Sequence, residues 1–281
     1  MSPEVSVVLV TYNRAKFLPR TLDSILNQSF RNFELIICDD CSPDDTASVC
    51  REYARRDSRI EYVRNPENLR MPGNLNSGLR RARCELVANL HDGDIYYPAL
   101  LEKWRAALLE YPSAAFVFNI YRHLAPGGTS GILTSTFKPL LSGREFLEDI
   151  CFADNQLECP VWGTVMARRS VYESLGYFDP SYSFWADFDM WFRIAESYDI
   201  AFVPELLIDL PSRAVMPHLF TDGAFTTHSM IFRAYWNARR RHFRNRPAKL
   251  TGQLAKQVFD FTYSRTTRVF KRAAKLVTSR A

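Results

Sequence analysis

The sequence predicts an α/β protein with a mixed, mostly parallel sheet flanked by helices, followed by a basic helical extension at its C-terminal end. Strand and helix patterns alternate through the first hundred residues, and the strands are almost continuously apolar, as in parallel sheets that are covered on both faces. A third observation, the basic excess confined to residues 225–281, predicts the extension.

The elements of the first half follow from side-chain periodicity. The run 5–10 is almost entirely β-branched, which is typical of a central parallel strand. Leucine and isoleucine then recur at helical spacing from 18 to 26, and Asp44–Thr46 can cap a second helix. The other elements expected in this half are strands at 33–38, 60–63 and 86–90, a helix that includes Gly78, Leu79 and Ala82, and a helix after Pro98.

The second half has a less regular pattern. We expect a strand at 115–121, a Gly/Ser/Thr-rich turn at 127–131, a strand at 161–168, a turn at 178–180 and then a helix that carries Asp187 and Asp189. Two acids near a helix start can simply complement the helix dipole. The predicted organisation is a body over 1–224, with halves 1–112 and 113–224, and the extension over 225–281.

The composition is that of an ordinary globular protein, with 24% charged residues in a chain long enough for one large or two small domains. No apolar run reaches the 18 or so residues of a membrane-spanning helix. The opening Met1–Glu4 has no basic region, so we expect no cleavable secretion signal and a cytoplasmic protein. Cys38 and Cys41 form a C-x-x-C pair, a pattern found in zinc and redox sites. No second pair completes a zinc site, and Cys38 ends a strand whereas the redox motif normally opens a helix.

Charge divides the chain into two unlike segments. Residues 225–281 carry 14 Lys and Arg against one acid, Asp260, whereas residues 1–224 carry 22 against 30 acids. Two interpretations remain: helices that pack on the body with a solvated basic face, or a basic, aromatic surface that binds anionic lipid. Nucleic acid is not expected, because the chain has no nucleic-acid recognition motif.

Polar residues gather where the predicted parallel strands end, and ligands bind at that edge of such sheets. These residues are Thr11–Arg14, Asp39–Asp40, Arg64–Asn65 and Asp92–Asp94. No glycine-rich phosphate loop follows any of these strands. We therefore expect any phosphate bound here to be held by a metal ion and basic side chains.

The segment Asp92–Asp94, with Gly93 between its carboxylates, has two interpretations. Like charges repel at the end of a buried strand and burial disfavours both ionised forms, a difficulty that a divalent cation removes. Hard oxygen ligands suit Mg²⁺ or Mn²⁺. Asp-Gly is also a common turn dipeptide, so an acidic turn explains the same residues.

Six groups of residues follow one another in a familiar order. They are Val5–Arg14 with Leu22, Ser24–Leu26 and Gln28, then Phe33–Ser42, Asn76–Leu79, Asp92–Asp94, Gly176–Asp179 and Ala186–Arg193. Together they resemble the family 2 glycosyltransferases, which have the GT-A (nucleotide-diphospho-sugar transferase) fold and use nucleotide sugars. The resemblance covers roughly residues 4–213, and it depends on the number and order of the motifs, since no single motif would suffice.

The resemblance implies a role for each matching residue. The nucleotide pocket would be lined by Thr11, Tyr12, Asn13, Arg14, Asp40, Arg70, Asn76 and Asp92, with Tyr12 against the base and Asp40 accepting a hydrogen bond from the base imide. Asp94 and Asp92 would hold Mn²⁺ or Mg²⁺ at the diphosphate, and His218 is either a further ligand or a surface residue. Asp187 would be the general base that deprotonates the acceptor hydroxyl.

Three features depart from the family pattern. The metal motif lacks a third acid, because His91 and Gly93 flank Asp92, and position 186 is Ala where Glu is common. The Gln-x-x-Arg-Trp signature of processive polysaccharide synthases is missing, together with their membrane helices. The third difference favours transfer of a single sugar.

The resemblance implies an inverting, metal-dependent glycosyltransferase that moves one sugar from a nucleotide-diphosphate sugar, a UDP-sugar above all, to a hydroxyl of a glycan or lipid-linked acceptor in cell-surface polysaccharide synthesis. It would work in the cytoplasm, with the basic extension as a peripheral contact to an anionic membrane surface. The alternative is a weak or inactive nucleotide-sugar-binding module at that surface, an interpretation that Ala186 and the unusual metal motif favour. Loops around 122–165 and 205–225 are expected to select sugar and acceptor.

Overall fold

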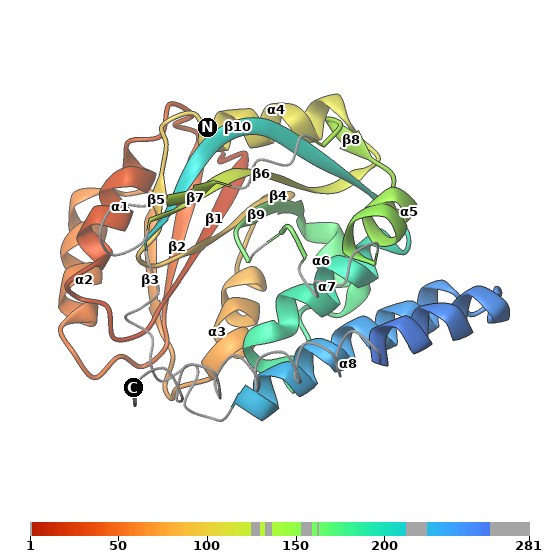
Figure 1. Cartoon of the computed structure of the whole chain (residues 1–281). Helices are drawn as coiled ribbons and strands as arrows, with labels where there is room; N and C mark the ends of the chain where they lie inside the picture. The colour runs from red at the N-terminus through yellow and green to blue at the C-terminus, as the bar shows by residue number, and fades with distance from the viewer. Residues whose placement is uncertain are drawn as a thin grey trace, which may run out of the picture.

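The computed structural model describes residues 2–124, 130–132, 137–152, 159–161, 163–211 and 224–258. One mixed sheet runs through these residues in the order β3-β2-β1-β4-β9-β6-β10-β5, with β7 beside β6 and β8 beside β10 (Figure 1). The strands are β1 Val5–Thr11, β2 Phe33–Asp39, β3 Ile60–Arg64, β4 Leu86–His91, β5 Ile95–Tyr96, β6 Ala114–Leu124, β7 Ser130–Ile132, β8 Leu140–Leu141, β9 Val165–Arg168 and β10 Asp199–Pro211.

The helices lie between and after these strands. They are α1 Leu18–Leu26, α2 Thr46–Arg56, α3 Arg70–Leu79, α4 Leu100–Glu110, α5 Gly143–Glu145, the π-helix η1 Phe146–Cys151, α6 Arg169–Leu175, the 3₁₀ segment η2 Pro180–Trp185, α7 Ala186–Ala195 and α8 Ala224–His242. A further helix spans 247–258. Helices are present after strands β1, β2 and β3, and after Pro98, as predicted. However, α3 ends at Leu79, so Ala82, which was expected within this helix, lies outside it.

The parallel half of the sheet is built around β1. This strand pairs in parallel with β2 on one side and β4 on the other, and Val5 lies opposite both Phe33 and Leu86. Every residue of β1 and β2 is buried, as the β-branched run predicted. Because β1, β2, β3 and β4 are parallel, their carboxyl ends meet at one edge of the sheet.

The second half makes the sheet mixed. β9 lies antiparallel between β4 and β6, and it begins at Val165 rather than at 161. β10 runs parallel to β6 through 199–211, so the part of the expected 205–225 loop up to 211 is a strand. Pro204 and Glu205 lie in a register shift between Val203 and Leu206. Proline is tolerated in a strand at such a bulge. Because Pro204 interrupts the strand pattern, this strand was not predicted from the sequence.

Helices cover both faces of the sheet (Figure 1). On one face α1 and α4 pack on alternate β1 residues such as Val7, and on the other α3, α6 and α7 pack on residues such as Val8. Trp104 of α4 and Trp191 of α7 are fully buried on these opposite faces. The two cores hold the strand ends rigidly enough to position a site.

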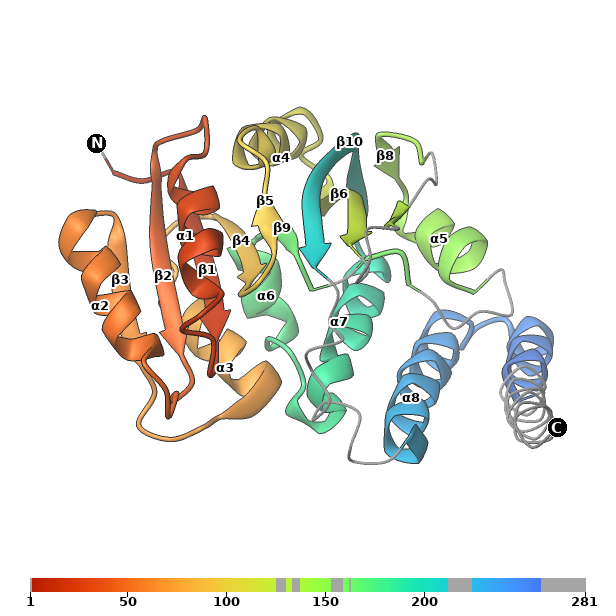
Figure 2. The same ribbon diagram turned by 60° about the vertical axis from the view of Figure 1, so that its left-hand side comes forward.

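The C-terminal extension packs on the body through α8, on the side of the molecule away from β3 (Figure 2). Tyr235 of α8 is fully buried, with its ring centroid 4.8 Å from that of Phe192 in α7. Glu148 accepts hydrogen bonds from His242 and Arg246, each at 2.8 Å, and from Lys249. For this part of the extension, the packing interpretation is confirmed; residues 259–281 lie outside the described chain.

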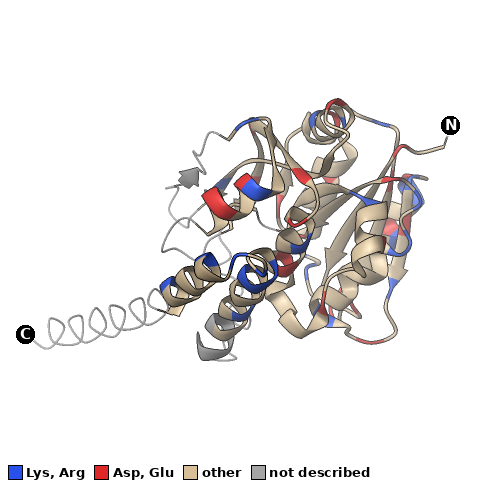
Figure 3. Cartoon of the chain, turned by 90° about the vertical axis from the view of Figure 1, so that its right-hand side faces the viewer, with Lys and Arg blue, Asp and Glu red and all other residues tan. Residues whose placement is uncertain are grey.

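Lysine and arginine line the two C-terminal helices (Figure 3). Several of these side chains make contacts within the protein. Arg239 is only 1% exposed, and its Nη1 donates a hydrogen bond to Gln257 Oε1 at 3.0 Å. Arg240 and Arg244 are exposed. No helix among the described residues is long and apolar enough to cross a membrane. The predicted turn at 127–131 lies mostly outside the described residues.

Candidate active site

At the end of β1, the hydroxyl of the last strand residue is buried and the aromatic ring of the next residue is exposed. Tyr12 is 42% exposed, whereas Thr11 is 2% exposed, and its Oγ1 has no hydrogen-bond partner among the described residues. Two hydrogen bonds to the segment after β2 fix the loop after β1. The Asn13 amide donates to Ser42 Oγ at 3.0 Å, and the Arg14 amide donates to Thr46 Oγ1 at 3.0 Å. Asn13 has a left-handed φ of 57°, which turns the chain at this point.

Asp40, which follows β2, organises the neighbouring loop. Its Oδ1 accepts hydrogen bonds from Asn65 Nδ2 at 2.9 Å and the Leu69 amide at 2.8 Å, and its Oδ2 accepts one from the Arg70 amide at 2.8 Å. A carboxylate has about four acceptor positions, so most of those on Asp40 are used within the protein. The arrangement presents Arg70 as an exposed side chain at the start of α3.

Asp39, the residue before Asp40, is fully buried, and its carboxylate also accepts hydrogen bonds from within the protein. Its carboxylate accepts hydrogen bonds from the Ser42 amide at 2.9 Å and the Tyr62 hydroxyl at 2.8 Å. Burial, together with this bond, raises the pKa of Tyr62. Arg64 Nη1 lies 3.4 Å from the same carboxylate, and most of the contacts of Asp39 therefore serve to fix the β2 end.

The Asp92–Asp94 turn lies against the β1 loop. Asp92 Oδ2 accepts a hydrogen bond from the Tyr12 amide at 3.2 Å, and Asp92 Oδ1 lies 3.7 Å from Arg14 Nε. Gly93 has a φ of +90°, a conformation that favours glycine. The carboxylate-bearing residue Asp94 is 3% exposed. The structure thus brings together the two strand-end segments that the sequence singled out.

Helix α1 and the residues that follow it fix that turn and the segment after it through polar side chains, of which sequence reasoning did not identify Thr21. Thr21 Oγ1 accepts a hydrogen bond from the Gly93 amide at 3.0 Å and donates one to the Asp94 carbonyl at 2.9 Å. Gln28 Nε2 donates to the Tyr97 carbonyl at 2.8 Å. Thr21 lies on the buried face of this apolar helix and Gln28 lies just after its end, and both are at most 1% exposed.

Asp187, in the first turn of α7, meets His91 across Gly163. A Cβ added to Gly163 would lie 2.5 Å from His91 Nε2 and 2.8 Å from Asp187 Oδ2. Three segments that are distant in sequence therefore converge at this point. Asp187 also acts on Tyr172, whose pKa is raised mainly by complete burial and further by the charge of this carboxylate.

Asn76 does not join this group. Its Nδ2 donates to the Phe178 carbonyl at 2.8 Å and its Oδ1 accepts from the Phe178 amide at 3.1 Å, with the side chain 6% exposed. Both amide groups are thereby used to fasten α3 to the 178 segment. One N–H and one lone pair of the amide are not used in these two bonds, and the expectation that Asn76 lines the nucleotide pocket stays a prediction.

Two further candidates have other outcomes. Asp189 is buried and its carboxylate pairs with Arg193 at 2.7 Å, so it forms an ion pair within α7 as well as lying in the first turn. His218 lies outside the described residues. Burial raises the pKa of the Cys38 thiol to about 12, which keeps it protonated and argues against a redox C-x-x-C site.

Asp92 and Asp94 are the candidate ligands of a divalent metal ion in this site. Among the described residues, no group of three or more His, Cys, Asp or Glu is placed to hold a metal ion. Asp92 and Asp94 supply hard oxygen donors from one turn, and Mg²⁺ commonly takes one or two carboxylates together with substrate phosphates. The residues fit a metal ion whose coordination a phosphate-bearing ligand completes.

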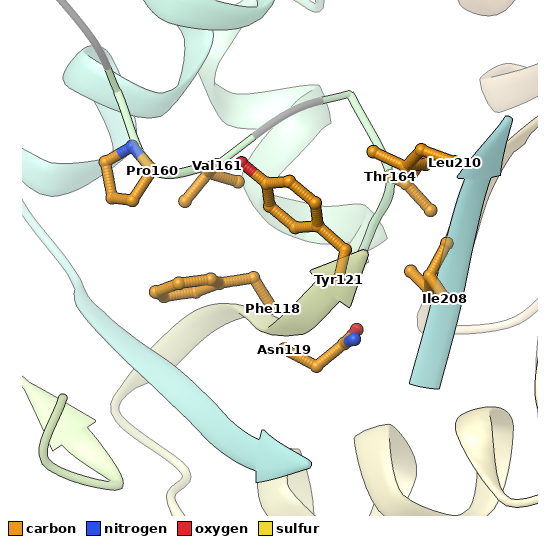
Figure 4. Close-up of a pocket in the computed structure, with 8 residues that line it drawn as sticks. All are labelled: Phe118, Asn119, Tyr121, Pro160, Val161, Thr164, Ile208 and Leu210. Atoms are coloured by element: carbon orange, nitrogen blue, oxygen red, sulfur yellow. The ribbon is translucent and has the colours of Figure 1, made fainter. Parts of the chain in front are cut away.

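A small, partly open pocket lies between β6, β10 and residues 160, 161 and 164. It is lined by Phe118, Asn119, Tyr121, Pro160, Val161, Thr164, Ile208 and Leu210 (Figure 4). Its volume of about 10 Å³ is only enough for a water molecule. It is therefore too small for a nucleotide or a sugar.

Comparison with known proteins places this geometry in a family. The family model described as "Glycosyl transferase family 2" matches residues 6–176. The chain belongs to glycosyltransferase family 2. The putative glycosyltransferase EpsE of Bacillus subtilis is 33% identical over 69% of this chain and 67% of its own length.

A second relative of this family 2 chain has a more specific name. It is the GalNAc(5)-diNAcBac-PP-undecaprenol beta-1,3-glucosyltransferase of Campylobacter jejuni, 42% identical over 33% of this chain and 30% of its own length. The chain therefore covers about two thirds of the length of EpsE and less than a third of the length of the Campylobacter protein.

Solved structures agree on the fold. TarS 1–349 of S. aureus in complex with UDP-GlcNAc has a TM-score of 0.69 at 17% identity, with 95% of this chain and 74% of that one covered. Mannosyltransferase PcManGT of Pyrobaculum calidifontis, in complex with GDP-Man and Mn²⁺, has a TM-score of 0.59 at 16% identity, with 99% and 81% covered. The predicted GT-A fold of the family 2 chain is confirmed.

Proposed function

We propose that this chain transfers a single sugar from a nucleotide-diphosphate sugar, a UDP-sugar above all, to a hydroxyl of a glycan or lipid-linked acceptor in cell-surface polysaccharide synthesis. The observation that carries the proposal is the convergence of the Tyr12 loop, the Asp92–Asp94 turn and Asp187 around one edge of the sheet. The neighbours that bind UDP-GlcNAc and GDP-Man support a nucleotide-sugar donor.

The β1 loop suits a nucleotide. The exposed Tyr12 ring offers a surface on which a base can stack, and the Thr11 hydroxyl is a buried polar group that a ligand can satisfy. Arg14 and the exposed Arg70 supply positive charge for a diphosphate. Asp40 acts mainly by shaping the loop before Arg70, since its carboxylate already accepts three hydrogen bonds.

Asp92 and Asp94 are the proposed ligands of Mn²⁺ or Mg²⁺. When bound, the metal ion would act as a Lewis acid that stabilises negative charge on the departing diphosphate. The Mn²⁺ complex of the structural neighbour supports this assignment. Thr21 keeps both residues in place through its two hydrogen bonds to the turn.

Asp187 is the proposed general base. An alcohol is a poor nucleophile until its proton is removed, and a positioned carboxylate typically contributes about 10²–10⁴-fold to the rate. Asp187 is partly exposed in the first turn of α7, where an acceptor can reach it. A single in-line attack by the acceptor oxygen breaks the bond from the anomeric carbon to the diphosphate and inverts that carbon.

The proposed location is the cytoplasmic face of a membrane, to which the basic extension attaches peripherally. The exposed Arg240 and Arg244 can meet anionic lipid. The name of the Campylobacter relative supports a lipid-linked acceptor for this chain. The alternative function, an inactive nucleotide-sugar-binding module, is favoured by Ala186 where the family commonly has an acid.

The test is release of nucleoside diphosphate from a panel of UDP- and GDP-sugars with Mn²⁺. We expect slow turnover with at least one sugar nucleotide, lost in both Asp92→Ala and Asp94→Ala and retained in the control Glu110→Ala, which replaces an exposed glutamate of α4. Absence of turnover across the panel would reject the enzyme. Thermal stabilisation by the same nucleotides, without turnover, would support the binding module.

A further inference from the structure

We infer that His91 is a positioning residue for Asp187, and that Gly163 has no side chain because the two must meet beside its Cα. The inference rests on the proposed role of Asp187 as base and adds two residues to it. His91 would hold Oδ2 of the Asp187 carboxylate, which leaves Oδ1 to face the acceptor hydroxyl.

The space around Gly163 carries the inference. A Cβ there would lie 2.5 Å from His91 Nε2, 3.2 Å from His91 Cε1 and 2.8 Å from Asp187 Oδ2. Real Cβ atoms essentially never come within 3.0 Å of a non-bonded heavy atom of another residue. The imidazole edge and the carboxylate therefore converge on one point, and any larger residue at 163 must push at least one of them away.

His91 is rigidly placed for this task. It is the last residue of β4, and its amide donates to the Tyr96 hydroxyl at 2.9 Å while its carbonyl accepts from the same hydroxyl at 2.9 Å. Tyr96 is 2% exposed, and its own amide donates to Ser24 Oγ at 3.2 Å. The backbone that carries the imidazole is thus fixed by α1 and β5.

Asp187 is equally constrained on its own side. Its neighbours Ala186 and Phe188 are 1% and 6% exposed, and Trp191 one turn later is fully buried. The backbone of Asp187 is therefore fixed, but a carboxylate can still rotate about χ1 and χ2. An imidazole N–H directed at Oδ2 would select one rotamer, and the catalytic value of a base depends on that orientation.

A metal-binding role for His91 is the competing explanation, because His91 precedes Asp92. Among the described residues, no set of three or more potential ligands that includes His91 is placed to bind a metal ion. The Nε2 atom instead points to the space that it shares with Asp187. The geometry favours an action of His91 through Asp187.

The experiment compares His91→Ala, His91→Gln, Gly163→Ala and Asp187→Asn, using the sugar nucleotide of the panel that gives the fastest turnover. We expect His91→Ala and Gly163→Ala to lower kcat by about 10- to 100-fold, as loss of an orienting partner does elsewhere, with KM for the donor unchanged. His91→Gln, whose amide N–H can replace the imidazole N–H, should recover part of that loss. Arg55→Ala, which removes an exposed side chain of α2, is the control.

A second measurement needs no turnover. In the ¹⁵N spectrum of the histidine side chains of the ligand-free protein, Asp187→Asn should shift the His91 signals and leave those of His123 in place. Unchanged His91 signals, or an unchanged kcat in His91→Ala while Asp187→Asn is inactive, would overturn the inference. Full activity in Asp187→Asn would instead reject the proposed base, and the spectrum would still decide whether His91 and Asp187 interact.

Discussion

The main-chain amide of Tyr12 donates a hydrogen bond to Asp92 Oδ2 at 3.2 Å, and so joins the ends of two adjacent parallel strands, β1 and β4. The exposed ring of Tyr12 and the acidic turn are therefore set relative to each other by backbone geometry. A ligand that stacks on Tyr12 has the carboxylates of the turn close by. This relationship turns two separate sequence motifs into one candidate site.

Replacement of either acid in the turn should abolish turnover for different reasons. Asp92→Ala removes the acceptor of the Tyr12 amide and the partner of Arg14, so donor affinity should fall together with kcat. Asp94→Ala should lower kcat by at least about 100-fold, because a charge-stabilising group is lost where the diphosphate departs. Steady-state kinetics with Mn²⁺ measure kcat, and calorimetric titration measures the donor Kd. Equal donor Kd in Asp92→Ala and the native protein would contradict the coupling between loop and turn.

The Thr21 hydroxyl should matter to both stability and donor binding. In Thr21→Val the Gly93 amide and the Asp94 carbonyl lose a buried partner, at a cost of about 1–3 kcal/mol in the free energy of unfolding. The turn should loosen, and the donor Kd should rise. Urea unfolding and calorimetric titration measure the two effects. Thr251→Val, at an exposed position in the last helix, should change neither.

The sequence predicted the parallel half of the fold because its strands are apolar on both faces and its ligands follow the strand ends. The segments Thr11–Arg14, Asp39–Asp40 and Asp92–Asp94 were found from that rule alone. β10 was missed because Pro204 and Glu205 interrupt its pattern at a register shift. Local periodicity does not show that a bulge can accommodate such residues.

The supporting contacts of the site were harder to predict, because they depend on which helix packs behind which turn. Thr21 looked like an ordinary position on an amphipathic helix, and His91 looked like a flank of the acidic pair. Gly163 gave no signal, since a single glycine in an irregular segment has many explanations. Only the three-dimensional arrangement shows that it lies between His91 and Asp187.

Asn76 should prove structural. In Asn76→Ala the amide and carbonyl of the buried Phe178 lose their partners, so the free energy of unfolding should fall by about 1–3 kcal/mol. The donor Kd should stay at its native value, because the side-chain amide bonds the backbone of Phe178. Calorimetric titration of UDP into the variant decides this. A large rise in Kd with native stability would support the expected nucleotide contact.

The contact between the body and the extension should weaken in acid. Burial raises the pKa of Glu148, but hydrogen bonds from Lys249, His242 and Arg246 outweigh this and hold it at about 2, against 4.5 for an ordinary glutamate. A depressed pKa stabilises the fold above the ordinary value and loses that effect as pH falls towards the folded value. The free energy of unfolding should therefore drop between about pH 4.5 and pH 2.

Urea unfolding over that pH range, on the native protein and on Glu148→Gln, isolates this contribution. The variant should be less stable than the native protein at pH 7, and the difference should shrink as the medium becomes acidic. A difference that stays constant with pH would show that the charge of Glu148 is not what holds α8 and the following helix to the body.

The proposed membrane attachment should depend on exposed basic side chains of the extension such as Arg240 and Arg244. Removal of α8 would expose the body surface that Tyr235 and Phe243 cover, so a truncation at 224 is expected to misfold. Truncation after 258 and the double variant Arg240→Glu/Arg244→Glu leave those buried contacts intact. Both should reduce flotation with vesicles of anionic phospholipid, and salt should reduce it for the native protein as well. Flotation equal to that of the native protein in both variants would assign the basic extension to packing alone.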